Sequence, residues 1–214
     1  MLQVPRNAFN WLGDFVAPVR CSACEAHGDV ICMECAAQFI VSDPVTRQAR
    51  DGAPPVIALG AYAGRLARAI RTIKFGGRRG AADWLGAQLA RRLCMPADVV
   101  VSVPLHAGRM RERGYNQAAL IANAVAKTLS LPFLPNALRR TVNTRAQSKL
   151  ALDQRRENVV RAFEPGTQAE RLYDRRVLLV DDVITSGATL AACAAALHEC
   201  RPRDIIGCAL ALRL

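Results

Sequence analysis

The stretch that decides the fold is Val177-Leu-Leu-Val-Asp-Asp-Val-Ile-Thr-Ser-Gly-Ala-Thr189. Its four leading apolar residues predict a buried strand, and this strand is expected to end in the adjacent carboxylates Asp181 and Asp182. A short loop of small and hydroxylic residues follows, and a helix is expected from about Gly187 to Cys200. Ligands of open α/β sheets bind at the carboxyl ends of the strands, so this loop is the first candidate for a binding site.

The residue types in the loop suit a sugar phosphate. Unpaired N–H groups at the start of a helix, together with the helix dipole, attract an anion. Thr185, Ser186 and Thr189 add hydroxyl groups, and Gly187 lets the backbone approach a ligand closely. The two carboxylates are poor partners for a phosphate but good acceptors for two vicinal hydroxyls. The motif therefore predicts binding of a ribose 5-phosphate.

Other classes of protein also have acidic residues after a strand, but the additional motifs that identify those classes are missing from this sequence. A Walker B strand would be accompanied by G-x-x-x-x-G-K-[ST], and a dinucleotide fold by G-x-G-x-x-G; the sequence has neither. A receiver domain opens with its strand and acid pair, whereas this pair lies near the C-terminus. A structural acid pair followed by a helix cap on an ordinary α/β strand stays the alternative.

The rest of the chain predicts an α/β fold. Apolar runs predict two further strands, over residues 99–103 and 205–212. Helical spacing of apolar residues predicts three further helices, over residues 64–74, 81–93 and 118–129. The residues between 104 and 117 are expected to form a loop. Strands separated by helices imply a mostly parallel sheet with helices on both faces.

Four cysteines near the N-terminus have the spacing of a metal site. Cys21-x2-Cys24 and Cys32-x2-Cys35 are two matched pairs, each able to place two thiolates on one turn. Together they supply the four sulfurs of a tetrahedral, structural zinc site. Redox-active pairs or buried thiols are the alternatives, and His27 is not needed as a ligand. Cys94, Cys193, Cys200 and Cys208 lack such spacing; Cys193 and Cys200, among apolar residues of the last helix, are expected in the core.

Composition limits the class of protein. Of the 214 residues 51% are hydrophobic, which excludes a disordered chain. The formal charge of +11 suits a polyanionic ligand, a nucleic acid or an acidic membrane surface. No uncharged apolar stretch approaches the roughly 18 residues of a membrane span, and the N-terminus does not read as a secretory signal. A cytoplasmic location, with reduced cysteines, is therefore expected.

A domain boundary is expected near residue 50, because residues 42–55 are rich in Pro, Asp, Gly and Arg and are interpreted as a linker or exposed loop. Residues 1–50 would hold an amphipathic element within residues 1–20 and the cysteine pairs. Residues 51–214 would form the α/β domain. Within it, residues 139–161 form a strongly basic segment.

Residues 177–189 resemble the signature of type I phosphoribosyltransferases that binds 5-phosphoribosyl 1-pyrophosphate (PRPP). The resemblance implies that Asp181 and Asp182 hold the ribose hydroxyls. It implies that a loop wraps the 5-phosphate, formed by Thr185, Ser186, Gly187, Ala188 and Thr189. It also implies a magnesium ion bound together with PRPP.

A four-cysteine knuckle before such a domain resembles the ComF family of competence-related proteins. Further segments carry the resemblance: residues 73–77 (Ile-Lys-Phe-Gly-Gly), 103–106 (Val-Pro-Leu-His), 109–117, Arg145-x-Gln147, and Arg156 with Asn158. Ile184 and Ser186 stand where the family often has an aromatic residue and Thr. The resemblance covers the chain from about Cys21 to Leu212.

A phosphoribosyl transfer site must neutralise the departing pyrophosphate with magnesium, backbone donors or cations. The candidate cations lie in three segments, and each has a solvated surface charge as its alternative: Lys74, Arg109, Arg113, Arg145 and Arg156.

The leading functional hypothesis is a PRPP-binding protein in DNA uptake. It would act on the cytoplasmic side of the inner membrane, with single-stranded DNA and the uptake machinery as partners. The alternatives are an active phosphoribosyltransferase with a nucleobase or related acceptor, and a non-catalytic PRPP sensor. Aromatic residues make up only 5% of the chain, so composition does not reveal a stacking platform for single strands. No acceptor-binding motif is evident either.

Overall fold

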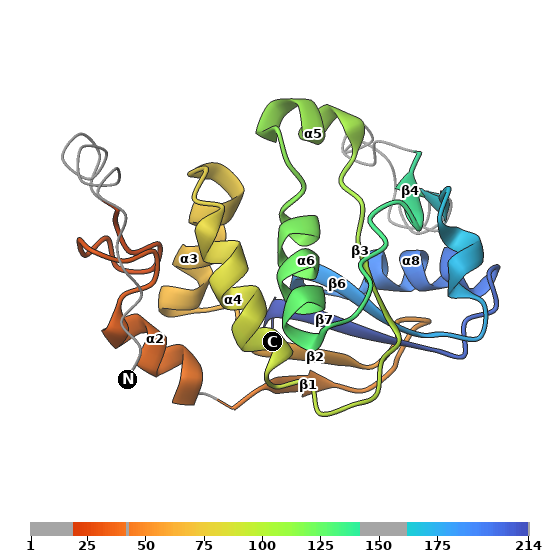
Figure 1. Ribbon diagram of the computed structural model, residues 1–214, viewed down its shortest axis with the longest axis horizontal. Coiled ribbons are helices and arrows are strands. Elements are labelled where there is room, and N and C mark those ends of the chain that lie inside the picture. The colour runs from red at the N-terminus through yellow and green to blue at the C-terminus, as the bar shows by residue number, and fades with distance from the viewer. Residues whose placement is uncertain (1–18, 42, 142–161, 214) are drawn as a thin grey trace.

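The computed structural model describes residues 19–41, 43–141 and 162–213 (Figure 1). The amphipathic element expected near the N-terminus and the candidate cations Arg145 and Arg156 lie outside the described residues. No helix within these three ranges combines the length and the apolar character that crossing a bilayer requires.

A five-stranded sheet forms the centre of the fold, in the order β1-β2-β7-β6-β3. Its strands are β1 (Val45–Arg47), β2 (Val56–Ala61), β3 (Val99–Ser102), β6 (Arg176–Ile184) and β7 (Asp204–Leu212). The pairs β2–β7, β7–β6 and β6–β3 are parallel, and only the edge strand β1 is antiparallel to its neighbour. The expected mostly parallel α/β sheet is confirmed.

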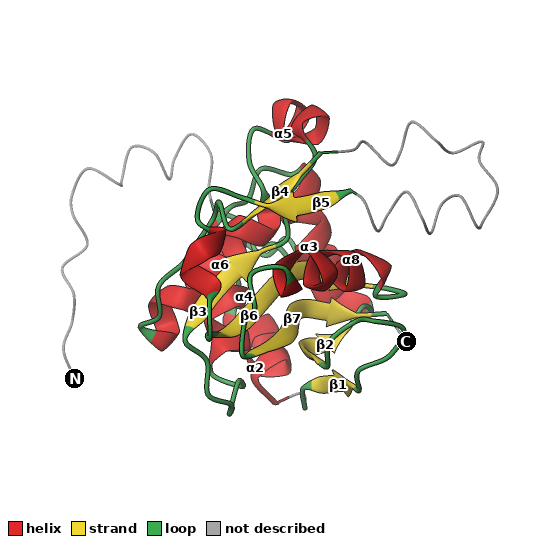
Figure 2. Cartoon of the chain, turned by 90° about the vertical axis from the view of Figure 1, so that its right-hand side faces the viewer, coloured by secondary structure: helices red, strands yellow, loops and turns green. Residues whose placement is uncertain are grey.

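The helices of the main body are α3 (Gly64–Phe75), α4 (Gly80–Ala90), α5 (Ala107–Arg113), α6 (Gln117–Leu129) and α8 (Ala188–His198). The remaining elements are α2 (Met33–Val41), the short strands β4 (Leu138–Arg140) and β5 (Phe163–Pro165), and the 3-10 helix η1 (Ala169–Leu172). Helices α3, α4 and α6 lie side by side over one face of the sheet (Figure 1). Helix α8 lies with the β4–β5 ribbon on the other side, where its residues share a core with β5 (Figure 2).

The central strand β6 contributes to the cores on both faces. Leu178 and Val180 belong to the core under α3, α4 and α6, whereas Val177 and Leu179 belong to the core under α8. Successive side chains of a strand point to opposite faces, so a continuous apolar run marks a strand buried on both. By the same alternation Asp181 is directed to the α8 side and Asp182 to the α3 side.

The structure differs from the sequence-based expectation at two of the strands. Strand β6 does not end before the acids, because its pairing with β7 continues through Asp181, Val183 and Ile184. Residues 42–55 were expected to form a linker or exposed loop. This expectation is wrong for residues 45–47, which form β1 and pair with β2. The proposed division of the chain at residue 50 stays a prediction.

The helices differ from the expectation at two places. The loop expected between residues 104 and 117 contains α5, which His106 caps by accepting a hydrogen bond from Gly108 and which ends at Gly114 in a left-handed conformation. Helix α4 ends at Ala90 rather than at residue 93. Helix α5 has no buried residue, so it carries no apolar periodicity that a sequence could reveal.

The cysteine-containing segment packs against α3 and α4. The Thr72 hydroxyl of α3 donates to the Ser22 carbonyl, and the Arg78 guanidinium binds both the Cys21 carbonyl and the Glu25 carboxylate. Cys21, Ala23, Ile31, Cys35 and Phe39 belong to the same apolar core as α3 and α4. The segment is therefore packed as part of the main body.

Candidate functional site

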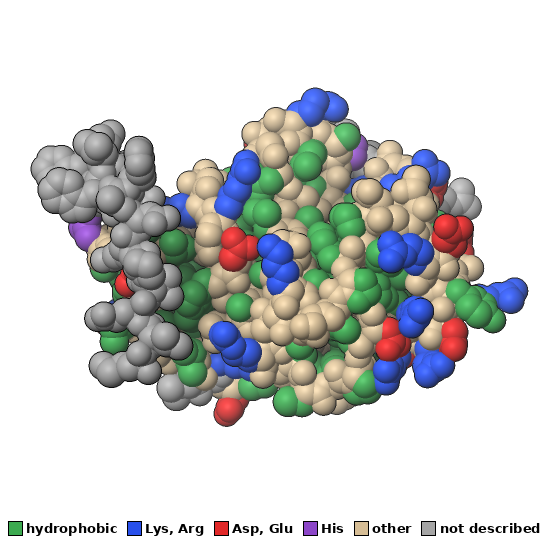
Figure 3. Space-filling model, in the orientation of Figure 1, with side chains coloured by type: hydrophobic (Ala, Val, Ile, Leu, Met, Phe, Trp, Pro, Cys, Tyr) green, Lys and Arg blue, Asp and Glu red, His purple; other side chains and the backbone are tan. Residues whose placement is uncertain are grey.

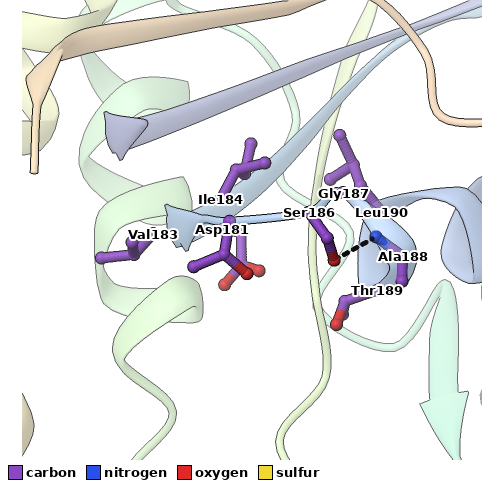
Figure 4. Close-up of a pocket in the computed structure, with 9 residues that line it drawn as sticks. Asp181, Val183, Ile184, Ser186, Gly187, Ala188, Thr189 and Leu190 are labelled. Atoms are coloured by element: carbon purple, nitrogen blue, oxygen red, sulfur yellow. Dashed lines mark hydrogen bonds between the residues drawn. The ribbon is translucent and has the colours of Figure 1, made fainter. Parts of the chain in front are cut away.

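The loop between β6 and α8 has the shape expected of a phosphate cradle. Gly187 precedes α8 with φ of 90°, a left-handed conformation that glycine adopts without strain. The Ser186 hydroxyl accepts a hydrogen bond from the Ala188 N–H. Figure 4 shows Asp181, Ser186 and Thr189 on one side of the loop and Ile184 on the other. These residues line a cavity of about 30 Å³ at the start of the helix.

The first N–H groups of α8 make the cradle electropositive. The first turn of a helix leaves its N–H groups without intrahelical partners, and the helix dipole adds partial positive charge there. No acidic residue lies in the first turn of α8, and its N-cap supplies no side-chain acceptor. The Ser186 hydroxyl accepts from the Ala188 N–H, and no acidic side chain competes with an anionic ligand for the positive end of the helix at Gly187.

Arg47 is a cation that contacts this loop and that the sequence did not predict. It comes from the edge strand β1, and its Nη1 donates to the Thr185 carbonyl over 2.7 Å. Its Nη2 is buried with no hydrogen-bond partner among the described residues. A Cβ added at Gly187 would lie 2.6 Å from that Nη2, so the glycine permits the close approach. Burial lowers the pKa of Arg47, and the nearby Arg50 lowers it further.

Asp182 is almost completely buried and is paired with Lys74. Only 4% of Asp182 is exposed, and its Oδ1 lies 2.8 Å from the Nζ of Lys74 near the end of α3. Its Oδ2 is buried and has no partner in the described part of the chain. A buried carboxylate needs such a counter-charge, because an unpaired ion in a protein interior is strongly destabilising. The structure therefore places the predicted cation Lys74 in direct contact with the acid pair.

Asp181 is half-buried and has a different electrostatic environment. Burial and the neighbouring charge of Asp182 raise the pKa of Asp181 to about 7, although Lys74 and Arg140 oppose the shift. Its carboxylate accepts a hydrogen bond from the Asp182 N–H over 2.8 Å. A hydroxyl that donates to Asp181 would favour the ionised form.

Helix α5 carries two of the predicted cations, and the contacts of Arg113 are with residues outside the acid pair. Arg113 donates to Gln117 over 3.0 Å, and its guanidinium lies over the ring of Phe75. Arg109 lies on the same short helix and is half-buried. These residues form a second basic area beside the end of α3.

The four predicted metal ligands come together. The Sγ atoms of Cys21, Cys24, Cys32 and Cys35 lie within 4.8 Å of one another. The Sγ atoms of Cys24 and Cys32 are 3.6 Å apart, close to the separation of about 3.8 Å that Zn–S bonds of ~2.3 Å give in a tetrahedron. The geometry of the sulfurs therefore fits a tetrahedral zinc ion.

Backbone hydrogen bonds prepare one of these sulfurs to act as a thiolate. The N–H groups of Ala23 and Cys32 both donate to the Sγ of Cys21 over 3.4 Å. Burial acts to raise the pKa of Cys21, but these donors outweigh it and lower the pKa to about 6. A thiolate is the form that binds metal.

The remaining cysteines are not part of this centre. Cys193 and Cys208 are fully buried in the core, where burial raises the pKa of both thiols. Cys200 is half-buried beside the core, and Cys94 is exposed. The prediction of core positions is thus confirmed for Cys193 and is met partly by Cys200.

Arg47 and Arg140 are the candidate site residues that the motif did not reveal. Both lie on short strands far from residues 177–189 in the sequence: Arg47 contacts the loop, and Arg140 acts electrostatically on Asp181. A three-residue strand gives little pattern to detect. The basic character of residues 139–161 was the only available signal for Arg140.

Comparisons with known proteins identify a matching domain family and several relatives. The profile of the phosphoribosyl transferase domain family matches residues 113–213. Competence protein F of Haemophilus influenzae is 33% identical over 147 residues, which are 63% of this chain and 62% of that protein. DNA utilization protein YhgH of Escherichia coli O157:H7 is 30% identical over 183 residues, 80% of this chain and 79% of that protein.

Among solved structures, the glutamine PRPP amidotransferase from B. subtilis, complexed with ADP and GMP, matches with a TM-score of 0.45 and 21% identity, over 61% of this chain and 26% of that chain. The match to competence protein F leaves more than a third of that protein uncovered. The match to YhgH spans most of both chains, and the cysteine pairs precede a domain of the phosphoribosyltransferase type. The chain therefore belongs to the ComF family, together with competence protein F and DNA utilization protein YhgH.

Proposed function

We propose that the protein binds PRPP at the carboxyl end of β6 and acts in DNA uptake. The observation that carries the proposal is the cradle at Gly187, where a helix N-terminus, loop hydroxyls and the half-buried guanidinium of Arg47 meet shortly after a pair of acids. An anion fits the first part and vicinal hydroxyls fit the second. A ribose 5-phosphate carries both groups.

In the proposed complex the 5-phosphate lies against the loop formed by Thr185, Ser186, Gly187, Ala188 and Thr189. The guanidinium of Arg47, beside Gly187, supplies positive charge close to this loop. The ribose hydroxyls donate to Asp181 and Asp182. The ammonium group of Lys74 forms an ion pair with the carboxylate of Asp182.

Magnesium is proposed to accompany PRPP, since Asp181 and Asp182, near the carboxyl end of β6, supply the oxygen ligands that this ion prefers. It would neutralise the pyrophosphate group when bound. Zinc is proposed for the four-cysteine centre, where the sulfur spacing fits it. It would hold the segment around residues 21–35 together.

A role in DNA uptake rests on the family and on charge. One relative is named as a competence protein and another as a DNA utilization protein. The formal charge of +11 fits the phosphates of a nucleic acid, whose neutralisation supplies much of the affinity of DNA-binding proteins. Lys and Arg side chains are spread over the face shown in Figure 3, including the tip at α5. The proposed location is the cytoplasmic side of the inner membrane, with the uptake machinery as partner.

Calorimetric titration of the zinc-loaded full chain tests the proposal. PRPP with magnesium is titrated into the wild type and into a variant with Asp181→Asn and Asp182→Asn. Saturable binding by the wild type that the variant lacks is expected, because an amide cannot replace a carboxylate as acceptor for both hydroxyls and metal. No binding by the folded wild type would refute the proposed ligand.

The same samples separate a binding protein from an enzyme. Pyrophosphate release is followed after a nucleobase acceptor is added to the PRPP complex. Release that requires both the acceptor and the acid pair would establish an active phosphoribosyltransferase. Binding without release over a broad acceptor panel would favour a PRPP sensor.

A further inference from the structure

An exposed aromatic ring lies directly beside the proposed PRPP site. Phe75 is the last residue of α3, and 73% of it is exposed to solvent. Its neighbour Lys74 points inward and contacts Asp182 over 2.8 Å. A single exposed apolar residue is common on protein surfaces and would mean little alone. Here the chain directs one side chain into the site and the next one out to solvent.

A guanidinium covers part of this ring. The Cζ of Arg113 lies 4.9 Å from the centre of the Phe75 ring, within the range of a cation–π contact. Arg113 is also held by Gln117, the buried first residue of α6, whose side-chain oxygen accepts its hydrogen bond over 3.0 Å. The cation is thus fixed against the ring at a defined place.

The backbone that carries the ring is anchored. The hydroxyl of the buried Tyr115 donates to the carbonyl of Ile73, two residues before Phe75. Arg79 lies over the Tyr115 ring, 4.6 Å from its centre, and is itself exposed. An aromatic side chain on a rigid support loses little conformational entropy when it binds a ligand.

The surroundings of the ring are basic. Arg113 lies over the ring itself, Arg79 follows Phe75 by four residues and lies over the ring of Tyr115, and Arg111 on α5 adds a further exposed cation. Proteins that bind single-stranded nucleic acid combine aromatic rings, on which bases stack, with cations that follow the phosphates. The 5% aromatic content gave no hint of such a place, because one well-placed ring is enough to form it.

We propose that Phe75, together with Arg113 and Arg79, forms a stacking site for a nucleobase of single-stranded DNA. The site deepens the proposed function and rests on it, since it assigns a surface for the DNA beside the PRPP site. The base stacks on the exposed part of the Phe75 ring, and the adjoining phosphates pair with the two guanidinium groups. A free nucleobase has the same planar chemistry but lacks the phosphates.

Fluorescence anisotropy with two labelled oligonucleotides tests the proposal on the zinc-loaded full chain. One probe is a 15-residue oligothymidylate, and the other is an abasic strand of the same length and charge. The wild type is expected to bind the thymidylate about 5- to 150-fold more tightly, the range that stacking on one ring gives. Phe75→Ala is expected to abolish this preference, and Phe75→Trp to retain it.

Tyr173→Ala is the matched control. Tyr173 is also exposed, by 67%, but it lies before the start of β6, at the opposite end of that strand from the acids. This variant is expected to keep the preference for the thymidylate. Equal binding of both strands by the wild type, or an unchanged preference in Phe75→Ala, would overturn the stacking site.

Two further measurements separate the possible failures. Millimolar free thymine is expected to leave the thymidylate bound. If free thymine displaces the thymidylate in a way that depends on Phe75, the ligand of this site is a free nucleobase and the proposed binding of single-stranded DNA is wrong. PRPP is titrated calorimetrically into the same wild-type preparation. If PRPP fails to bind while the Phe75-dependent preference remains, the proposed PRPP function is wrong and the stacking surface stands by itself.

Discussion

The four-cysteine centre and the proposed PRPP site are built by different means. Cys21 to Cys35 lie within 15 consecutive residues, and a turn at residues 22–24 and the start of α2 bring their sulfurs together. The PRPP site takes its acids from β6, its cradle from the start of α8, Lys74 from α3 and Arg47 from β1. The first site depends on local spacing, and the second depends on the assembled sheet.

This difference predicts how each site fails. A centre built from one short segment should lose the arrangement of its sulfurs when one ligand or the metal is lost, because the hydrogen bonds and apolar contacts of that segment with α3 and α4 do not hold four thiolates together. A site assembled by the sheet keeps its backbone conformation when one side chain changes. Each single substitution there should therefore alter one property, either the local charge, the backbone strain or the ligand affinity. The predictions below test this contrast in order of decreasing effect.

Loss of the metal should have the largest effect. Structural zinc contributes about 10–16 kcal/mol of apparent binding energy in isolated fingers, so Cys35→Ser or a strong chelator should abolish zinc binding and lower the melting temperature. Metal content and circular dichroism melts measure this. Cys94→Ser, which changes an exposed cysteine outside the centre, is the control and should behave as the wild type. Full zinc content and unchanged melting in Cys35→Ser would contradict the assignment.

Removal of Lys74 should be next in size. Lys74→Met leaves the buried carboxylate of Asp182 without its counter-charge, and breaking such a pair costs roughly 3–5 kcal/mol. Urea unfolding at neutral pH should show a loss of stability on the order of 3 kcal/mol. Lys74→Arg keeps the charge and should lose much less. A loss below about 1 kcal/mol in Lys74→Met would show that the pair is not held in the folded protein.

Gly187→Ala should have a smaller effect with two separable parts. The left-handed backbone costs alanine about 1–2 kcal/mol, and the new Cβ would also meet the Nη2 of Arg47. We expect lower stability and weaker PRPP binding. In an Arg47→Ala background the clash disappears and only the backbone strain remains, so the cost should fall. Equal costs in both backgrounds, measured by urea unfolding, would place Arg47 away from the loop.

The pH dependence of Asp181 should be the smallest effect. Its pKa of about 7 lies above the ordinary value near 4, so the native state holds more protons than the unfolded state between these values. Stability should therefore fall as pH rises from about 4 to about 7, by on the order of 1 kcal/mol from this group, because solvent screens a half-exposed carboxylate. Asp181→Asn should lose that part of the slope and be more stable than the wild type at pH 8.

PRPP should reverse the sign of this effect. Ribose hydroxyls donate to the ionised form of Asp181, so affinity should increase as pH rises towards 7. Thermal shift measurements at several pH values, with and without PRPP and magnesium, give both slopes. Identical pH slopes for the wild type and Asp181→Asn without ligand would show that Asp181 ionises at its ordinary pKa.

The contrast also explains how far the sequence could predict the molecule. The cysteine spacing predicted a cluster that the structure shows, and the apolar run at Val177 predicted a buried strand, which the structure shows as β6. Both signals are local. The strand's true end at Ile184 was missed, because the acids continue the pairing with β7 instead of interrupting it.

The contacts between distant elements could not be predicted in the same way. Nothing in residues 42–55 indicated that β1 would bring Arg47 to the loop after β6. The exposed Phe75 belongs to an otherwise amphipathic helix, and its place beside Arg113 depends on α5, which lacks apolar periodicity. Such contacts follow from the packing of the sheet and its helices.

The central claim is that the loop after β6 holds the phosphate of PRPP. A crystal structure of the full chain grown with PRPP and magnesium tests it most directly. We predict the 5-phosphate within hydrogen-bond distance of the backbone N–H groups of residues 187–189, with the ribose hydroxyls on Asp181 and Asp182. PRPP bound elsewhere, or this loop empty at a saturating PRPP concentration, would contradict the account.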